Sequence, residues 1–490
     1  MLLLIILFLP LAAAVLTYLS GQKLAGWVAL GATVAEFALS LVALEHYAHS
    51  DTSGLLYSHA WISNPNISFS IMADGLSILL VVLTTFLVPV IILSSFGREQ
   101  VNARSLYSLI LLMQFALIGV FVAQDGLFFY IFWELALIPI YFIALLWGDG
   151  KDREFRNTAT FKFFVYTLIG SLFMLVAFIF LYTKAGSLSL QTLYGLDLTY
   201  SEQVFVALAF FFAFAIKIPV FPFHTWQADT YKEAPTVGTM LLAGIMLKMG
   251  IYGLLRWLLP IAPHVFTHNA MGGFSWNAVF ITMSVIGIVY GSILAIQQKD
   301  MKRLLAYSSF AHVGLIAAGI FSLTAEGLQG AVVQMLAHGV NVVGAFFAGE
   351  IIFRRTGTLE IDKLGGIRSQ APKFATAFII IVLASVALPT TNAFIGEFLL
   401  LYGVFGYNTI LSIIAGLTII LGAVYMLKMY QNTMLGETKT LTSGFKDLAA
   451  SELAVFVILI VAIFVCGVYP KPIMEIAQPA LAEILKSTLR

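Results

Sequence analysis

The chain has 490 residues; 60% of them are hydrophobic, 10% are charged, and the formal net charge is +1. Because a soluble protein of this length carries about 25% charged residues, the composition predicts a polytopic membrane protein surrounded by a lipid bilayer. The small net charge gives no sign of a nucleic-acid partner. The lone cysteine, Cys466, cannot form an internal disulfide or hold an iron–sulfur cluster, and no nucleotide-binding loop is present. We therefore expect no cofactor and no metal ion in this chain.

Apolar segments occupy most of the chain. A helix needs about 20 apolar residues to cross the bilayer, and about 14 segments meet this length. Since backbone groups in lipid have to be paired within their own segment, the predicted fold class is an all-α polytopic membrane protein. The predicted spans begin near Leu2, Leu24, Asp74, Ala103, Leu127, Thr158, Val204, Thr236, Asn277, Lys302, Gly327, Lys373, Thr409 and Glu452.

Lysine and arginine concentrate in alternate loops, around residues 98–104, 151–156, 299–303 and 354–373. Loops with an excess of these residues remain on the cytoplasmic side of a membrane. The alternation supports the predicted number of spans. It places both termini on the outer, periplasmic side of a bacterial inner membrane.

Two groups of five spans repeat along the chain. Pro219 and Pro389 are 170 positions apart, and the fourth and ninth spans begin at about the same separation. Because each unit has an odd number of spans, the second unit is inverted in the membrane, as in many transporters. The alternative is that evenly spaced helices show the same separation by chance. The predicted domains are three N-terminal spans (1–102), a first five-helix repeat (103–258), an inverted second repeat (273–432), and a last span with a tail (433–490).

Two spans, one in each repeat, combine proline with a charged residue. Lys217 precedes Pro219 and Pro222, and Glu397 follows Pro389. A proline interrupts a helix because it removes a backbone donor. An ionisable residue in hydrocarbon is costly and usually marks an ion pathway. The pair of broken, charged helices therefore predicts an ion-handling membrane protein.

Four further ionisable residues lie near the middle of their spans: Glu134, Lys248, His312 and His338. At about 1.5 Å per helical residue, each lies roughly 12–18 Å into a ~30 Å core. Charged side chains that only extend to the membrane surface lie near helix ends instead. A row of titratable groups at one depth favours proton relay.

A purely structural role is the alternative for each of these groups. In that interpretation Glu134 and Lys217 form an ion pair that pins two helices, the histidines hydrogen-bond across helices, and Glu397 caps a helix. Relay is favoured because burial disfavours the charged form of a group, whereas a nearby opposite charge stabilises that charged form. The proton affinity of Lys217 then depends on how close Glu134 lies.

Two other acids belong to neither repeat's row. Asp74 opens a span in the motif DGLS and is predicted to be a helix N-cap. Glu36 lies in the middle of the second span, and its only expected role is a contact with a neighbouring subunit.

Five segments of the chain resemble the antiporter-like, proton-translocating subunits of respiratory complex I, the NADH:quinone oxidoreductase. The similarity runs from about residue 72 to residue 397 and more weakly to the end. Glutamate at position 397, where other antiporter-like subunits have lysine, resembles the M-type subunits, the counterparts of mitochondrial subunit 4. The segments are FWELALIPIYF, KIPVFPFHTW, EAPTVGTMLLAGIMLKMGIYGLLR, DMKRLLAYSSFAHVG and QMLAHGVNVVGAFF.

The resemblance implies a proton path. It makes Glu134 the carboxylate paired with the broken-helix Lys217, Lys248 the central lysine and His338 the relay histidine beyond it. Glu397 is then the terminal group, and His312 matches the histidine of the AYSSxxH motif. One segment departs from the family pattern: residues 227–231 read QADTY, without the usual proline and histidine. We assign no role to that loop.

The resemblance also implies partners. It predicts a translocase subunit without a redox centre, assembled with L-like and N-like antiporter subunits. FMN, iron–sulfur clusters and the quinone site are then expected in other subunits. Two alternatives use the same fold: a subunit of a multi-subunit Na⁺(K⁺)/H⁺ antiporter, and the membrane arm of a hydrogenase complex. Glu397, the chain length and the lack of an extra domain favour complex I.

Overall fold

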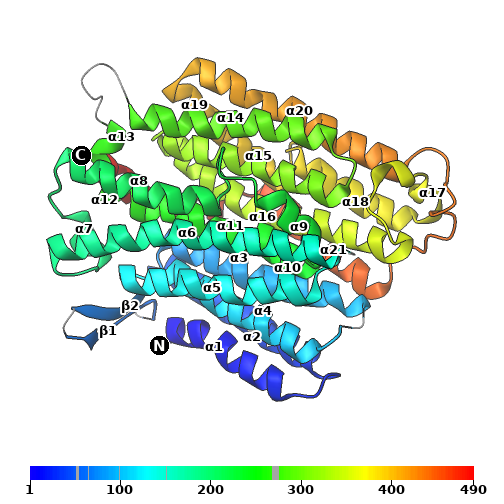
Figure 1. Ribbon diagram of the computed structural model, residues 1–490, viewed down its shortest axis with the longest axis horizontal. Coiled ribbons are helices and arrows are strands. Elements are labelled where there is room, and N and C mark those ends of the chain that lie inside the picture. Colours follow the sequence, from blue (N-terminus) through cyan, green and yellow to red (C-terminus); the bar gives the residue numbers. More distant parts are fainter. Residues whose placement is uncertain (51–53, 64–65, 99, 151, 268–274, 490) are drawn as a thin grey trace.

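The computed structural model describes all residues except 51–53, 64–65, 99, 151, 268–274 and 490. Its long helices lie side by side and run across the view in Figure 1, with both chain termini at one end of them. The backbone supports this placement of the termini. The amide of Leu3 donates to the carbonyl of Gly54 (3.2 Å), and the C-terminal helix touches Gly75.

The first half of the chain, up to the end of the eighth predicted span, contains most of the irregular elements. Its elements are α1 (Leu2–Leu19), α2 (Ala25–Ala48), β1 (Leu56–Ile62), β2 (Ile67–Met72), α3 (Gly75–Ser94), η1 (Ser95–Gly97), α4 (Ala103–Val122), α5 (Gly126–Trp147), α6 (Arg153–Ala185), α7 (Leu190–Tyr194), α8 (Tyr200–Lys217), α9 (Gln227–Glu233), α10 (Thr236–Leu241), η2 (Leu242–Met246), α11 (Leu247–Gly253), η3 (Leu254–Leu258) and α12 (Leu259–Ile261).

The second half is more regular. Its elements are α13 (Pro263–Thr267), α14 (Trp276–Gln297), α15 (Met301–Phe321), α16 (Ala325–Thr356), η4 (Ile361–Lys363), α17 (Ile367–Gln370), α18 (Pro372–Ser385), α19 (Asn392–Tyr407), α20 (Thr409–Met434), α21 (Ala450–Val468) and α22 (Lys471–Thr488).

The predicted fold class is confirmed. In the described part of the chain, 13 helices are long and apolar enough to cross a membrane. The shorter apolar helices α18 and α19 together supply one more crossing, which accounts for all the predicted spans. Residue 273, the predicted start of the second repeat, lies outside the described residues, and α14 is the first long helix after it.

Side-chain caps fix where several of these helices begin. Asp152 accepts hydrogen bonds from the amides of Glu154 (3.0 Å) and Phe155 (3.1 Å), and Asp300 accepts one from the amide of Arg303 (3.0 Å). These carboxylates satisfy amides that the first helical turn leaves unpaired. The loops on the lysine- and arginine-rich side are thereby fixed at the starts of α6 and α15.

Two helices are interrupted inside the bundle. The first, α8, stops at Lys217, and the chain resumes as α9 only after Pro219 and Pro222. The indole of Trp226 donates to the carbonyl of Ile216 (2.9 Å). Tertiary hydrogen bonds of this kind satisfy carbonyls that a broken helix leaves free.

The second interruption separates α18 from α19 and contains Pro389. Here the side-chain amide of Asn341, on α16, donates to the carbonyl of Ala384 (3.1 Å). Glu397 lies on α19, in the half-helix that follows the break. In both interruptions a polar side chain stabilises the end of the first half: Trp226 comes from the start of α9, and Asn341 comes from α16.

Sequence reasoning missed two elements at the end of the bundle that holds the termini. Strands β1 and β2 form an antiparallel hairpin in the register Leu56↔Met72 within a segment expected to be a loop. Helix α22 replaces the expected tail and packs on α3 and α16. At Gly75 a side chain would clash, because an added Cβ would lie 1.8 Å from the carbonyl oxygen of Ile476. The glycine therefore lets α22 lie directly on the start of α3.

Candidate functional site

The centre of the site is a contact between two buried side chains on different helices. Lys248 on α11 is fully buried, and its Nζ lies 2.9 Å from Nδ1 of His338 on α16. The same Nζ donates to the carbonyl of Ala243 (2.7 Å), which belongs to the π-helical turn η2. Single π-helical turns are rare and frequently occur at functional sites. Lys248 is therefore held between a backbone acceptor and a titratable ring.

A second contact joins α15 to the broken helix. Nδ1 of His312 lies 3.1 Å from Oε1 of Glu397, a distance typical of an ion pair, although the angles are not those of a hydrogen bond. Gln334 of α16 donates its side-chain amide to the same oxygen (3.3 Å). Both carboxylate and imidazole are buried. Glu397 thus faces inward, toward the centre of the bundle.

The two contacts meet at the histidines. The ring centroids of His312 and His338 are 6.2 Å apart. Both rings line a cavity of about 30 Å³ together with Ser308, Gln334 and Asn341. A cavity of this size with several polar groups in its lining has room for a water molecule, which needs only about 10–15 Å³ for its centre. A hydrogen-bonding bridge between the two imidazoles therefore fits the geometry.

One nitrogen of each histidine ring is free to bind water in this cavity. Within the described residues, Nε2 of His338 and Nε2 of His312 have no protein hydrogen-bond partner. An imidazole can take a proton on one nitrogen and release another from the other nitrogen. Lys248, His338, His312 and Glu397 consequently form one series of neighbouring groups.

Glu134 and Lys217 form a separate group. Lys217 is the last residue of α8, is 2% exposed, and places its Nζ 5.3 Å from the ring centroid of Trp133. Glu134 lies close enough to Lys217 for the two charges to interact, and Ser171 is near its carboxylate. Among the ion pairs of the described residues, however, Glu134 and Lys217 do not form one.

The ion pair of the structural alternative is therefore absent from the described residues, and Glu134 and Lys217 interact across a gap. Trp133 and Glu134 are consecutive on α5, and consecutive side chains on a helix point about 100° apart. The indole faces the ammonium of Lys217, so the carboxylate of the next residue points in a different direction.

The first broken helix lies against the helix of the central lysine. At Gly250 of α11, an added Cβ would lie 2.5 Å from Cγ1 of Ile218 and 3.1 Å from the carbonyl oxygen of Phe214. Glycine at this position lets the end of α8 approach α11 closely. Lys217 and Lys248 thus lie at the two sides of one helix–helix contact, without a direct hydrogen bond between them.

The acids outside the row have other partners. Glu36 is 1% exposed and accepts a hydrogen bond from the amide of Gln114 (2.9 Å), so it faces inward and does not contact a neighbouring subunit through its carboxylate. Asp74 caps α3 by accepting from the amide of Ser77 (3.0 Å), as predicted. It also forms an ion pair with the buried Arg256 of η3.

Several site residues were missed from the sequence. Gln334 and Asn341 lie on the same face of α16 as His338, at spacings of four and three residues, so helical periodicity alone carried a signal for them. Ser308 and Trp133 gave no such signal, because small polar and aromatic residues are common throughout the chain. In the described residues, no group of three or more histidine, cysteine or acidic side chains is arranged to hold a metal ion.

Comparisons with known proteins agree with this geometry. Residues 123–465 match the family model described as NADH:quinone oxidoreductase/Mrp antiporter, TM. The chain is 39% identical over 494 residues to NADH-quinone oxidoreductase subunit M of Rickettsia typhi, covering 98% of each chain. It is 36% identical to NADH-ubiquinone oxidoreductase chain 4 of Arabidopsis thaliana, covering 94% of this chain and 91% of the relative.

Solved structures agree as well. A chain of respiratory complex I from Thermus thermophilus with bound NADH superimposes with a TM-score of 0.90 and 30% identity over the full length of both chains. A chain of the Mrp complex from Dietzia sp. DQ12-45-1b has a TM-score of 0.83 at 19% identity, which shows a shared fold. The resemblance noted in the sequence is confirmed: this chain belongs to the family of membrane subunits shared by NADH:quinone oxidoreductases and Mrp antiporters.

Proposed function

We propose that this chain moves protons through the bilayer as an M-type membrane-arm subunit of an NADH:quinone oxidoreductase. The observation that carries the proposal is the series of contacts Lys248–His338, His312–Glu397 and the cavity between the two histidines. No redox centre is assigned to this chain. FMN, iron–sulfur clusters and quinone belong to partner subunits, and L-like and N-like subunits are the expected neighbours.

Relay along this series needs only one proton to move at a time. The ammonium of Lys248 donates a proton to Nδ1 of His338, which becomes doubly protonated and releases the proton on Nε2. A water molecule in the cavity carries it to His312, and the carboxylate of Glu397 accepts it from there. Glu397 lies on a half-helix behind a proline break, where hydrated backbone offers an outlet. The next cycle starts when Lys248 is reprotonated.

Glu134 and Lys217 are proposed to control when the relay runs. The charge on Glu134 favours the protonated form of Lys217, and loss of that charge disfavours it. Because no ion pair holds the two groups together, a small movement of α5 relative to α8 changes the interaction. Moving one proton against 100 mV requires about 2.3 kcal/mol, which corresponds to a change of about 1.7 pKa units.

Glu134→Gln is expected to abolish most coupled proton pumping while leaving the complex assembled. Glutamine keeps the shape and the contact with Ser171 but removes the charge that acts on Lys217. Glu134→Asp should keep part of the activity, because it keeps the charge at shorter reach. Proton uptake per quinone reduced, measured in membrane vesicles containing the intact complex, checks this result.

Glu36→Gln is the matched control for this variant. It makes the same substitution at a buried acid of another span, outside the proposed row, and it should pump like the wild type. If Glu134→Gln pumped as well as Glu36→Gln, the role of Glu134 is structural.

The orientation of the chain is a further part of the proposal. The loops of Arg153 and Lys363 are assigned to the cytoplasm and the hairpin residue His59 to the periplasm, since basic loops stay inside. Single cysteines at these three positions, in a Cys466→Ser background, should react with an impermeant maleimide from opposite sides. Labelling of positions 153 and 59 from the same side would contradict the 14-span topology.

A further inference from the structure

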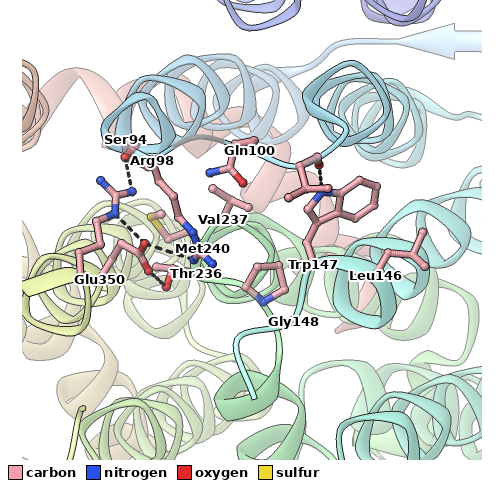
Figure 2. A pocket seen from close by; sticks show the side chains of 13 residues that line it. Ser94, Arg98, Gln100, Leu146, Trp147, Gly148, Thr236, Val237, Met240 and Glu350 are labelled. Atoms are coloured by element: carbon pink, nitrogen blue, oxygen red, sulfur yellow. Dashed lines mark hydrogen bonds and ion pairs between the residues drawn. The ribbon is translucent and has the colours of Figure 1, made fainter. Parts of the chain in front are cut away.

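The end of the bundle assigned to the cytoplasm contains a pocket of about 190 Å³. It opens between the end of α3, the end of α5 and the start of α10, and Figure 2 shows the side chains that surround it. Its polar wall carries Arg98, Glu350 and Arg354, and Val237 and Met240 of α10 form an apolar wall. No group of the relay row described above lines this pocket.

Glu350 is the buried acid of the pocket. Its carboxylate accepts hydrogen bonds from the hydroxyl of Thr236 (2.5 Å) and from Nε of Arg354 (2.7 Å), and Arg98 lies 4.0 Å away. The residue is 4% exposed although the pocket beside it is open to the surface. A carboxylate in this position meets water on one side and the protein interior on the other.

Arg98, which lines the pocket, also belongs to a second set of ion pairs. Asp149 pairs with Arg98 (2.9 Å) and with the buried Lys302 (3.0 Å), which also donates to the carbonyl of Ala234 (2.9 Å). Burial acts to raise the pKa of Asp149, but Lys302 and Arg98 outweigh it and hold that pKa below its usual value. Asp149 therefore stays charged and tied to its partners at neutral pH.

These groups lie at the ends of the helices that carry the relay. Asp149 lies two residues after α5, Thr236 begins the helix that continues to Lys248, Lys302 is in the first turn of α15, and Glu350 belongs to α16. The residues Glu134, Lys248, His312 and His338 are on those same four helices. One ionic network thus connects the cytoplasmic ends of all four.

The inner end of the pocket points along the helix of Lys248. Met240 lines the pocket and lies one helical turn before Ala243, whose carbonyl binds Nζ of Lys248. Just beyond, α16 and η2 touch backbone to backbone: an added Cβ at Gly339 would lie 2.9 Å from the carbonyl oxygen of Gly244. The apolar wall at Met240 is therefore about one helical turn from the carbonyl that holds Nζ of Lys248. Thr236, which binds Glu350, is seven residues from that carbonyl, about 10 Å along the helix.

We propose that this pocket is the aqueous inlet that resupplies protons to Lys248, with Glu350 as the proton-accepting group on its wall. Water in the pocket delivers a proton to the Glu350 carboxylate. The carboxylic acid then releases this proton to water that enters between the pocket and η2, and this water protonates the neutral amine of Lys248. The amine becomes an ammonium while Glu350 returns to its anion. The contact at Gly244 and Gly339 is the point that opens during transfer. This inference rests on the proposed relay through Lys248.

The first test is whether a charged, water-soluble reagent can reach the pocket from the cytoplasmic side. In a Cys466→Ser background, Val237→Cys should react rapidly with a charged, impermeant methanethiosulfonate reagent added to inside-out membrane vesicles, whose outer surface is the cytoplasmic face. A thiol reacts as the thiolate, which needs water. Phe142→Cys, on the outer surface of α5 (42% exposed), is the matched control and should stay unmodified in lipid.

Modification of Val237→Cys should then lower proton pumping about tenfold relative to the same variant before modification. A failure of the reagent to reach Val237→Cys in the intact complex would overturn the inlet. Normal pumping after complete modification would overturn it as well.

The second test is the pH profile of Glu350→Gln. Two charged groups lie next to Glu350: Arg354 of its own helix, and Arg98, which follows η1. Arg98 in turn pairs with Asp149, which pairs with Lys302. Tyr107 of α4 lies near Arg354. If Glu350 collects protons, Glu350→Gln slows turnover most at high pH, where protons are scarce, and Glu350→Asp partly restores it. A merely structural loss lowers turnover equally at every pH, and that result contradicts the inlet.

Lys248→Ala separates the two hypotheses. If it stops pumping while Glu350→Gln and modified Val237→Cys pump normally, the inlet is elsewhere and the relay stands. If Lys248→Ala itself pumps normally, the proposed relay fails whatever the pocket does.

Discussion

Lys248→Ala is expected to stop coupled proton pumping and to lower NADH-driven quinone reduction at least tenfold, a change of about 1.4 kcal/mol in the activation barrier. The ammonium of Lys248 is the only group that contacts both the π-helical carbonyl of Ala243 and Nδ1 of His338 in the described structure. Alanine removes the proton carrier at the middle of the row and leaves no side chain of similar reach to replace it.

Some loss of stability will accompany this substitution. The carbonyl of Ala243 and Nδ1 of His338 lose their donor, and an unsatisfied buried polar group costs about 1–3 kcal/mol. The measurement is therefore made on membranes in which the complex is shown to be intact. Lys248→Arg keeps a cation of different reach and proton affinity, so it should assemble better than alanine and still pump poorly.

Lys184→Ala is the matched control. Lys184 is the exposed lysine at the end of α6, with a side chain that is 45% accessible, and its loss should leave pumping unchanged. If Lys248→Ala retained full quinone reduction and full pumping in an intact complex, a relay through Lys248 would be refuted.

Glu397→Ala should lower coupled quinone reduction about as strongly as Lys248→Ala, whereas Glu397→Lys should keep part of the activity. The carboxylate lies 3.1 Å from Nδ1 of His312 and is the acceptor for Gln334. Alanine leaves His312 without a neighbour that can take its proton. A lysine at this position is also titratable, and its neutral amine can accept a proton from the ring.

The order of activities is the diagnostic feature. Proton uptake and turnover should rank wild type above Glu397→Lys and Glu397→Lys above Glu397→Ala. Glu475→Gln, at an exposed acid of α22 (60% accessible side chain), serves as the control and should behave like wild type. Alanine activity equal to wild type in an intact complex would place the outlet elsewhere and leave Glu397 with only a structural role.

The sequence alone determined the fold class and singled out the ionisable groups that lie in the middle of the spans. Spans are recognisable because each one has to satisfy its own backbone in lipid, so hydrophobicity over about 20 residues is a local and sufficient signal. Broken helices are recognisable for a similar reason, since Pro219 and Pro389 remove backbone donors at fixed positions. Neither signal depends on knowing which helices touch.

The tertiary structure decided which of those groups are neighbours. Side-chain direction around a helix axis depends on the packing of helices far apart in the sequence. Lys248 and His338, for example, are 90 positions apart and meet only because α11 lies against α16. The same cause turned Glu134 away from direct contact with Lys217 and turned Glu36 inward to Gln114.

The pocket around Glu350 also required the tertiary structure. Its charged residues come from loops and helix ends in both halves of the chain, and in the sequence they are indistinguishable from the other charges of the basic loops. Burial and pairing single them out, because a charge at a helix end is common and a buried carboxylate beside an open pocket is not. Those two properties arise only when the four helices of the relay come together at one end.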